Sequence, residues 1–421
     1  MRRNPCGNSR RAGPPGWAML ALLVAACREP TTASPVLWGT VYAPGGRAVA
    51  GATVQVGSDV RVTDQAGRFQ FDRVTPGRIV LRASAQGYQS DSFAVDVRGG
   101  STRALVQLPH LNVFEFGSYA LYYPRQRNIS SWGPRTSVDT AFAVVVALGG
   151  PDTRAFVTGK PFGAPNPAVE AALQEMGDSL RALANTMSIA ILGTSSAALP
   201  NSAASDASIL AALDAAADAS GRVELRRAPI MAYGLSGGGP EASGLMARRK
   251  SRVIGGLLKV PVALEPYVPS DTTIPAFVML AEQDAFVNTA AIATDVVARR
   301  AAGAAWGMAL EKGVIHHSLS APQRALTLQW MRDVMHLSFY CDGWDTAGWP
   351  IGPQRIDERS GYVGDPVTGT VSGWGPALSA RWYSYSWLPK AASAARWKAI
   401  ILPGSTGTVA SEPDGCDVWG T

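Results

Sequence analysis

A serine near the middle of the chain has the neighbours that a nucleophilic serine needs. Gly234-Leu235-Ser236-Gly237-Gly238 has the spacing G-x-S-x-G and lies between the apolar run Pro229–Leu235 and a helix-favouring segment that begins at Pro240. Glycines at these positions leave room for nearby backbone where the serine takes unfavourable backbone angles. The arrangement predicts a hydroxyl exposed between a strand and a helix. The alternative is a glycine-rich turn with an incidental serine.

A serine hydroxyl is a poor nucleophile unless a base removes its proton and an acid orients that base. The sequence has four histidines that could be the base: His110, His316, His317 and His336. Two carboxylates, Glu282 and Asp284, follow the apolar run Ala276–Leu280 and are the candidate acids. For either of them, the alternative interpretation is a solvated loop carboxylate.

From Pro109 to about residue 340, short apolar runs alternate with segments of helical spacing, which predicts a parallel sheet covered by helices on both faces. The expected strands are Tyr119–Tyr123, Phe142–Leu148, Ile189–Leu192, Pro229–Leu235, Val253–Val260, Ala276–Leu280 and Trp306–Leu310. The expected helices are Pro167–Met187, Ala207–Ala219, Thr289–Arg300 and Pro322–Met335, together with the one that follows Pro240.

This order of elements resembles that of the α/β-hydrolases over residues 111–340. The segment Tyr119-Ala120-Leu121-Tyr122-Tyr123-Pro124 is similar to the entry strand of secreted esterases in this superfamily. The resemblance implies the α/β-hydrolase fold, a mostly parallel sheet with helices on both faces. It also implies that nucleophile, acid and histidine follow one another in the chain.

Applied to this sequence, that order makes Ser236 the nucleophile. Ala281–Val287 resembles the superfamily's G-x-x-D-x-x-V segment with alanine for the glycine, which favours Asp284 as the acid. The spacing G-x-x-H in the loop after Trp306–Leu310 favours His316 as the base, and His317 remains the alternative.

Acyl transfer also needs donors that stabilise the developing oxyanion. The resemblance implies that the backbone N–H of Gly237 is one of them. The second would come from the loop Leu148-Gly149-Gly150-Pro151-Asp152, where many relatives have His-Gly-x. Here Pro151, which has no N–H, stands at the usual donor position. We therefore expect Gly150 to supply the donor, with Asp152 or a different construction as the alternatives.

The amino terminus has the composition of an export signal. Four arginines precede the apolar run Trp17–Ala26, which is too short to span a bilayer as a helix. The run ends in Val24-Ala25-Ala26-Cys27, which resembles the lipobox of bacterial lipoproteins. The resemblance implies removal of residues 1–26 and lipid on Cys27, so that a membrane, at the periplasmic face or the cell surface, is a partner. An ordinary secretory signal is the alternative.

Charge and cysteines fit an exported chain without cofactor, metal or nucleic acid. Residues 1–26 carry four arginines and no acidic residue, so the mature chain has 34 basic and 32 acidic residues. The sequence shows no basic stripe that would indicate nucleic-acid binding, and its histidines and cysteines do not have the spacing of metal ligands. Cys341 and Cys416 are left to pair, and in an oxidising compartment we expect a disulfide between them. Two free thiols are the alternative.

Residues 27–35 are predicted to form a short flexible tether between the lipid anchor and the first domain. From Val36 on, apolar and polar residues alternate, which predicts an all-β domain. This stretch, residues 36–110, resembles the carboxypeptidase regulatory-like domain, a small Greek-key β-sandwich whose members are not catalytic. The residues that match the family pattern are Gly39-Thr40-Val41, Val49–Val54, Thr63-Asp64, Gly67, Phe69, Phe71, Val74, Pro76-Gly77 and Ala85–Tyr88.

Residues 111–421 then form the α/β-hydrolase domain, and the Trp-rich tail, 341–421, is expected to wrap around it. The whole pattern predicts an exported serine hydrolase that cleaves carboxylic esters, of small molecules or of a polymer, through an acyl-enzyme on Ser236. One alternative is a peptidase of the prolyl-oligopeptidase type, although no β-propeller precedes the domain. The other is an inactive hydrolase-fold lipoprotein that binds at the surface, which the altered oxyanion loop favours.

Overall fold

The computed structural model describes residues 34–42, 48–85, 88–108, 112–124, 141–150, 152–164, 166–195, 201–266, 274–338, 356, 359, 361–374 and 384–405. The signal peptide predicted at 1–26 lies outside these residues, as do Cys27, Cys341 and Cys416. Among the described helices, none is both long and apolar enough to cross a membrane.

The amino-terminal domain is a sandwich of two β-sheets. Its strands are β1 (Val36–Tyr42), β4 (Arg68–Phe71) and β7 (Ser101–Gln107) in one sheet, and β2 (Thr53–Val56), β3 (Asp59–Val62), β5 (Gly77–Ser84) and β6 (Asp91–Val97) in the other. Alternation places one face of each strand inside, as β4 illustrates: Phe69 and Phe71 are buried and their rings meet edge to face at 6.1 Å. The predicted β-sandwich is therefore confirmed.

The second domain is built on a single eight-stranded sheet in the order β15-β14-β13-β12-β10-β11-β9-β8. Neighbours pair in parallel except β9, which is antiparallel to both β8 and β11. The strands are β8 (Val113–Phe116), β9 (Tyr119–Tyr122), β10 (Val144–Gly149), β11 (Ala190–Thr194), β12 (Ile230–Leu235), β13 (Val253–Lys259), β14 (Ala276–Ala281) and β15 (Trp306–Glu311). This order and these directions are those of the α/β-hydrolase fold that the sequence predicted.

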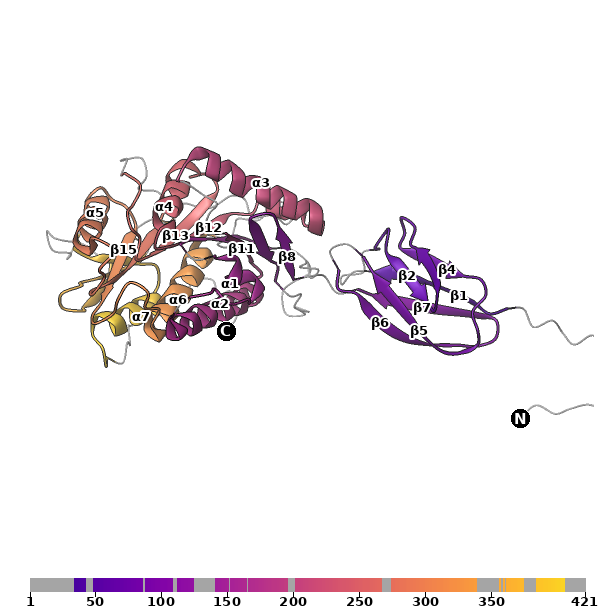
Figure 1. The fold of residues 1–421 in the computed structure, drawn as a ribbon. Helices are drawn as coiled ribbons and strands as arrows, with labels where there is room; N and C mark the ends of the chain where they lie inside the picture. Colours follow the sequence, from indigo (N-terminus) through magenta and orange to yellow (C-terminus); the bar gives the residue numbers. More distant parts are fainter. Residues whose placement is uncertain are drawn as a thin grey trace, which may run out of the picture.

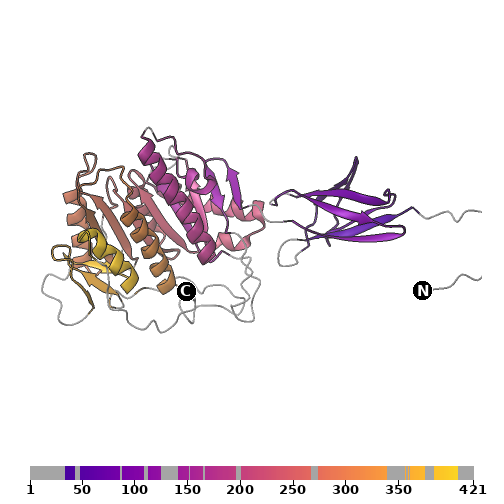
Figure 2. The same cartoon turned by 90° about the horizontal axis from the view of Figure 1, so that it is seen from below.

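Helices cover both faces of the sheet (Figure 1). Each face has its own apolar core. One face is covered by α3 (Ala203–Ser220), α4 (Gly238–Arg248) and α5 (Thr289–Ala301). The other, seen in Figure 2, is covered by α1 (Arg154–Thr158), α2 (Pro167–Met187), α6 (Ala321–Ser338) and α7 (Ala391–Ile401). Because most strands are buried on both sides, they are almost continuously apolar.

Local signals set the ends of the helices. The side chain of Asn166 accepts a hydrogen bond from the N–H of Ala168, and Pro167 occupies the first helical position, so α2 begins where it was predicted. Helix α3 begins at Ala203 rather than at the expected Ala207, because the side chain of Ser202 caps it by accepting from the N–H of Ser205.

The described part of the carboxyl-terminal tail packs against this domain. It contains a small sheet of β16 (Tyr362–Gly364), β17 (Val371–Gly373) and β18 (Ser386–Leu388), followed by α7. Trp387 and Trp397 are fully buried in the same core as α2 and α6. The indole N–H of Trp397 and the hydroxyl of Ser386 both donate to the carbonyl of Met308 on β15. These contacts fix the tail to the edge strand of the main sheet.

Candidate active site

Ser236 lies in the sharp turn between β12 and α4, at the carboxyl edge of the sheet. Its φ of 51° is in the left-handed region, which non-glycine residues rarely adopt. Three backbone hydrogen bonds hold it there. Its N–H donates to the carbonyl of Lys259 at 2.9 Å, and its own carbonyl accepts from Gly239 at 3.0 Å and from Val262 at 3.2 Å. The strained backbone projects the hydroxyl away from the sheet.

The surrounding glycines are required by close backbone contacts. A Cβ on Gly238 would lie 2.2 Å from the carbonyl oxygen of Leu148, and one on Gly234 would lie 2.7 Å from the carbonyl oxygen of Gly238. Both distances are shorter than any real contact. Gly237 differs, because a Cβ there would have no atom within 4 Å. The G-x-S-x-G pattern thus marks the positions where β12, α4 and β10 approach one another most closely.

His316 reaches this serine from the loop after β15. Its Nε2 lies 2.7 Å from the Oγ of Ser236, and its side chain is only 4% exposed. The loop therefore places the imidazole where it can accept the hydroxyl proton. His317, the alternative base, is exposed and meets the His316 ring edge-on at 4.9 Å.

Asp284 completes the arrangement from the loop after β14. Its Oδ2 lies 2.7 Å from the Nδ1 of His316, and its Oδ1 accepts from the backbone N–H groups of Phe286 at 2.8 Å and Val287 at 3.0 Å. With three donors and a side chain that is 1% exposed, the carboxylate has a fixed orientation. A carboxylate that accepts from Nδ1–H holds the imidazole in the tautomer whose Nε2 is free to take a proton.

The other candidates from the sequence lie elsewhere. Glu282 accepts a hydrogen bond from the N–H of Gly313 at 2.9 Å, so it braces the loop that carries the histidine. His336 is buried in α6, where its Nδ1 lies 2.8 Å from the amine of Lys390. His110 falls outside the described residues.

The oxyanion side of the site differs in part from the prediction. Gly237 carries a backbone N–H for which no acceptor is found among the described residues, so it is available to a substrate. Gly150 lies next to the nucleophile, since a Cβ on it would be 4.0 Å from the Ser236 hydroxyl. Its N–H, however, points to the carbonyl of Leu235 at 3.3 Å, because the pairing of β10 with β12 continues past Gly149. The N–H of Gly150 is therefore engaged within the sheet, and the alternatives for the second donor are Asp152 or an oxyanion hole that is built differently.

Three exposed apolar residues, which were not predicted from the sequence, lie next to members of the triad along the chain or through a backbone bond. Phe286 is 72% exposed and its ring lies 5.3 Å from that of His316. Ile315, next to that histidine, is 50% exposed, and Val262, whose N–H donates to the Ser236 carbonyl, is 45% exposed. We call these three residues the apolar rim. The signal that could have found it was the position of Phe286 and Ile315 directly beside the candidate acid and base.

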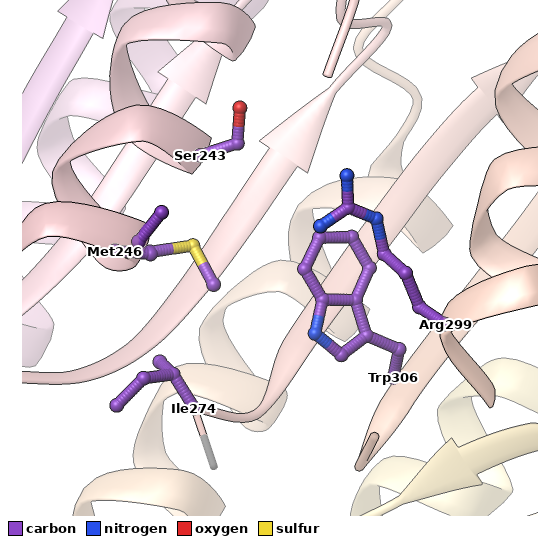
Figure 3. Close-up of a pocket in the computed structure, with 6 residues that line it drawn as sticks. Ser243, Met246, Ile274, Arg299 and Trp306 are labelled. Atoms are coloured by element: carbon purple, nitrogen blue, oxygen red, sulfur yellow. The ribbon is translucent and has the colours of Figure 1, made fainter. Parts of the chain in front are cut away.

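A separate small cleft lies towards the opposite edge of the sheet (Figure 3). There the guanidinium of Arg299 covers the ring of Trp306 at 4.5 Å, and the hydroxyl of Ser243 accepts from the N–H of Glu265 at 2.8 Å. Ile274 precedes β14 and Trp306 is the first residue of β15, so the cleft does not lie at the carboxyl edge of the sheet that carries Ser236. Within the described ranges, no three His, Cys, Asp or Glu side chains are grouped so that they could hold a metal ion.

Residues 36–109 match the family model of the carboxypeptidase regulatory-like domain. The match covers the β-sandwich and confirms the resemblance stated for it. No curated protein sequence matches the chain significantly.

Several solved structures are similar to the α/β domain. Esterase PE8 is 14% identical, with 46% of this chain and 94% of that one covered and a TM-score of 0.33. An esterase from Pyrobaculum calidifontis is 17% identical, with 51% and 79% covered and a TM-score of 0.33. A carboxylesterase from Mesorhizobium loti is 15% identical, with 53% and 99% covered and a TM-score of 0.33. The fold assignment rests on the strand order and directions described above.

The contacts of the glycines give a test of the turn. We expect Gly238→Ala to destabilise the protein by about 3 kcal/mol, because the new methyl group would overlap backbone of Leu148. Gly237→Ala is the matched control, since it has open space and a φ of −57°, and we expect a change within about 0.5 kcal/mol. Urea unfolding followed by circular dichroism measures both. Equal stability of the two variants would contradict the close approach of β10 and α4.

Proposed function

We propose that this protein is a serine hydrolase that cleaves carboxylic esters through an acyl-enzyme on Ser236. The observation that carries the proposal is the continuous hydrogen-bonded chain from the Ser236 hydroxyl through His316 to Asp284, with both links at 2.7 Å. A serine, a base within hydrogen-bond reach and an acid that orients the base together activate a hydroxyl for attack on an acyl carbon.

In the proposed reaction, the Oγ of Ser236 attacks the ester carbonyl while Nε2 of His316 takes the hydroxyl proton. Asp284 stabilises the imidazolium that forms. The N–H of Gly237 donates to the oxyanion of the tetrahedral intermediate. His316 then protonates the leaving alcohol, which leaves an acyl group on Ser236. Water, deprotonated by His316, attacks the acyl-enzyme, and the acid is released as the serine recovers its proton.

The apolar rim favours an ester with an apolar group over a peptide. A substrate that reaches Ser236 passes Phe286, Ile315 and Val262, and covering these side chains releases water from apolar surface. A peptidase of the prolyl-oligopeptidase type, which cleaves peptides, uses the same order of triad residues. We rank them second, because the domain that precedes the triad is a small β-sandwich. A surface binding protein without activity is the other alternative.

We also propose that the chain is exported and anchored to a membrane through lipid on Cys27. This rests on the sequence alone: four arginines, an apolar run and Val-Ala-Ala-Cys in that order. The expected membrane face is periplasmic or external. The β-sandwich would then stand between the anchor and the hydrolase domain.

The nucleophile assignment is tested with Ser236→Ala. We expect turnover of p-nitrophenyl esters to fall by roughly four to six orders of magnitude, because no other group forms the acyl-enzyme. Labelling by a serine-directed fluorophosphonate should be lost as well, while circular dichroism should be unchanged. If the wild-type protein neither hydrolysed esters nor took the label, the inactive binding protein would be the better interpretation.

The two neighbouring histidines have separable roles. We expect His316→Ala to lower kcat/KM at least about a thousandfold, because it removes the base that lies 2.7 Å from Ser236. The matched control is His317→Ala, which changes the next residue and should cost less than about tenfold, since this ring is exposed. Steady-state kinetics on one ester decides between them. The reverse order would assign the base to His317.

The role of the apolar rim is tested with Phe286→Ala and esters of increasing acyl length. We expect kcat/KM for p-nitrophenyl hexanoate to fall roughly tenfold, and that for the acetate much less, because only the longer chain covers the ring. Val223→Ala is the control, since it removes a similarly exposed apolar side chain from the segment before β12. A uniform loss for all chain lengths would mean that Phe286 supports Asp284 and does not contact the substrate.

A further inference from the structure

A buried threonine closes the loop that passes beside the nucleophile, and it has no role in the reaction proposed above. The loop leaves β10 at Gly149 and enters α1 at Arg154. Thr153, the residue before that helix, is fully buried. A buried hydroxyl costs free energy unless it is hydrogen-bonded, so the partners of Thr153 indicate what this residue holds in place.

The hydroxyl of Thr153 joins the loop to the ends of two strands. It donates to the carbonyl oxygen of Ala147 on β10 at 2.6 Å, and it accepts from the backbone N–H of Thr194, the last residue of β11, at 2.8 Å. The carbonyl oxygen of Thr194 lies 3.0 Å from the same hydroxyl and can share its proton. Both the donor and an acceptor site of the hydroxyl are therefore used.

The backbone and the methyl group of Thr153 are held as well. Its N–H donates to the carbonyl oxygen of Thr194 at 2.9 Å. A Cβ on Gly193 would lie 2.3 Å from the carbonyl oxygen of Thr153, so the loop approaches β11 as closely as a glycine allows. The methyl group lies 3.2 Å from where a Cβ on Gly149 would be. It therefore packs against the start of the same loop.

These contacts attach the loop on both sides of the point where it passes the nucleophile. Gly150 is that point, since a Cβ on it would lie 3.9 Å from the Cβ of Ser236. On one side, the N–H of Gly150 donates to the carbonyl of Leu235 on β12 at 3.3 Å. On the other side, the hydroxyl of Thr153 reaches back six residues to Ala147. The height of the loop above Ser236 is thus set by β12 and by Thr153.

We propose that Thr153 is a positioning residue of the hydrolase, whose hydroxyl holds the loop after β10 at the distance from Ser236 that the oxyanion requires. The inference rests on the proposed function of the triad. Negative charge develops on an oxygen beside Ser236, and donors stabilise it most when they are already in place. Asp152, one of the alternatives for the second donor, directly precedes Thr153, so the two residues would move together. A displacement of about 1 Å can cost about a hundredfold in rate.

The test is Thr153→Val, which keeps the shape of the side chain and removes the hydroxyl. We expect kcat for p-nitrophenyl acetate, per active site, to fall roughly thirtyfold while KM changes less than about threefold, because the loss is confined to the transition state. Active sites are counted by fluorophosphonate labelling that is run to completion. A purely structural role would lower the number of active sites and leave kcat per site unchanged.

Two further variants separate the hydroxyl from the general effect of changing a buried threonine. Thr153→Ser keeps the hydroxyl, and we expect it to retain kcat per site within about threefold of the wild type. Thr327→Val is the matched control, because this threonine of α6 is equally buried and no partner for its hydroxyl is found among the described residues. Its kcat should stay within about twofold.

A folded Thr153→Val protein with the wild-type kcat per site would overturn the proposal. Equal losses in Thr153→Val and Thr153→Ser, or in Thr153→Val and Thr327→Val, would also overturn it. If Thr153→Val does not fold, Thr153→Cys takes its place, because a thiol forms weaker hydrogen bonds and should lower kcat per site about fivefold. An unchanged kcat in that variant would equally contradict the proposal. Failure of the proposed function looks different, because the wild-type protein would then neither hydrolyse esters nor take the fluorophosphonate label.

Discussion

The site depends on the strained backbone of Ser236, whose unfavourable φ angle must be maintained by the surrounding structure. A non-glycine residue at a φ of 51° persists only where its surroundings fix it, and here three backbone bonds do so. Two of those bonds come from Lys259, the last residue of β13, and from Val262, which lies in the segment after it. The direction of the nucleophile is therefore set by the neighbouring strand as much as by its own turn.

The same constraint explains how distant segments converge. Parallel strands end at one edge of the sheet, so the loops after β12, β14 and β15 bring together Ser236, Asp284 and His316. They span 80 residues between nucleophile and base. Gly238 permits close packing of β10 against α4. This packing fixes the position of Ser236 relative to the loops that carry Asp284 and His316. A small shift of that helix would lengthen the bond to the histidine.

The parts of this arrangement that have a strong local signal in the sequence were predicted correctly. The G-x-S-x-G turn has a strand before it and a helix after it, and α2 has both a capping residue and apolar residues at helical spacing. The sequence did not predict β8, a four-residue strand that exists only because β9 pairs with it. The strands and helix of the tail were missed for the same reason, since their order depends on burial of Trp387 and Trp397. The second oxyanion donor could not be predicted, because whether Gly150 continues the sheet pairing is decided by β12.

The burial of Lys259 could not be predicted from the sequence. In Leu257-Leu258-Lys259-Val260 it reads as the solvated end of an apolar strand, because charged residues are usually exposed. In the fold, Lys259 is 3% exposed at the end of β13, where its carbonyl accepts the N–H of Ser236. The sequence therefore indicated the strand that ends at this residue, but not that the carbonyl of Lys259 holds the nucleophile.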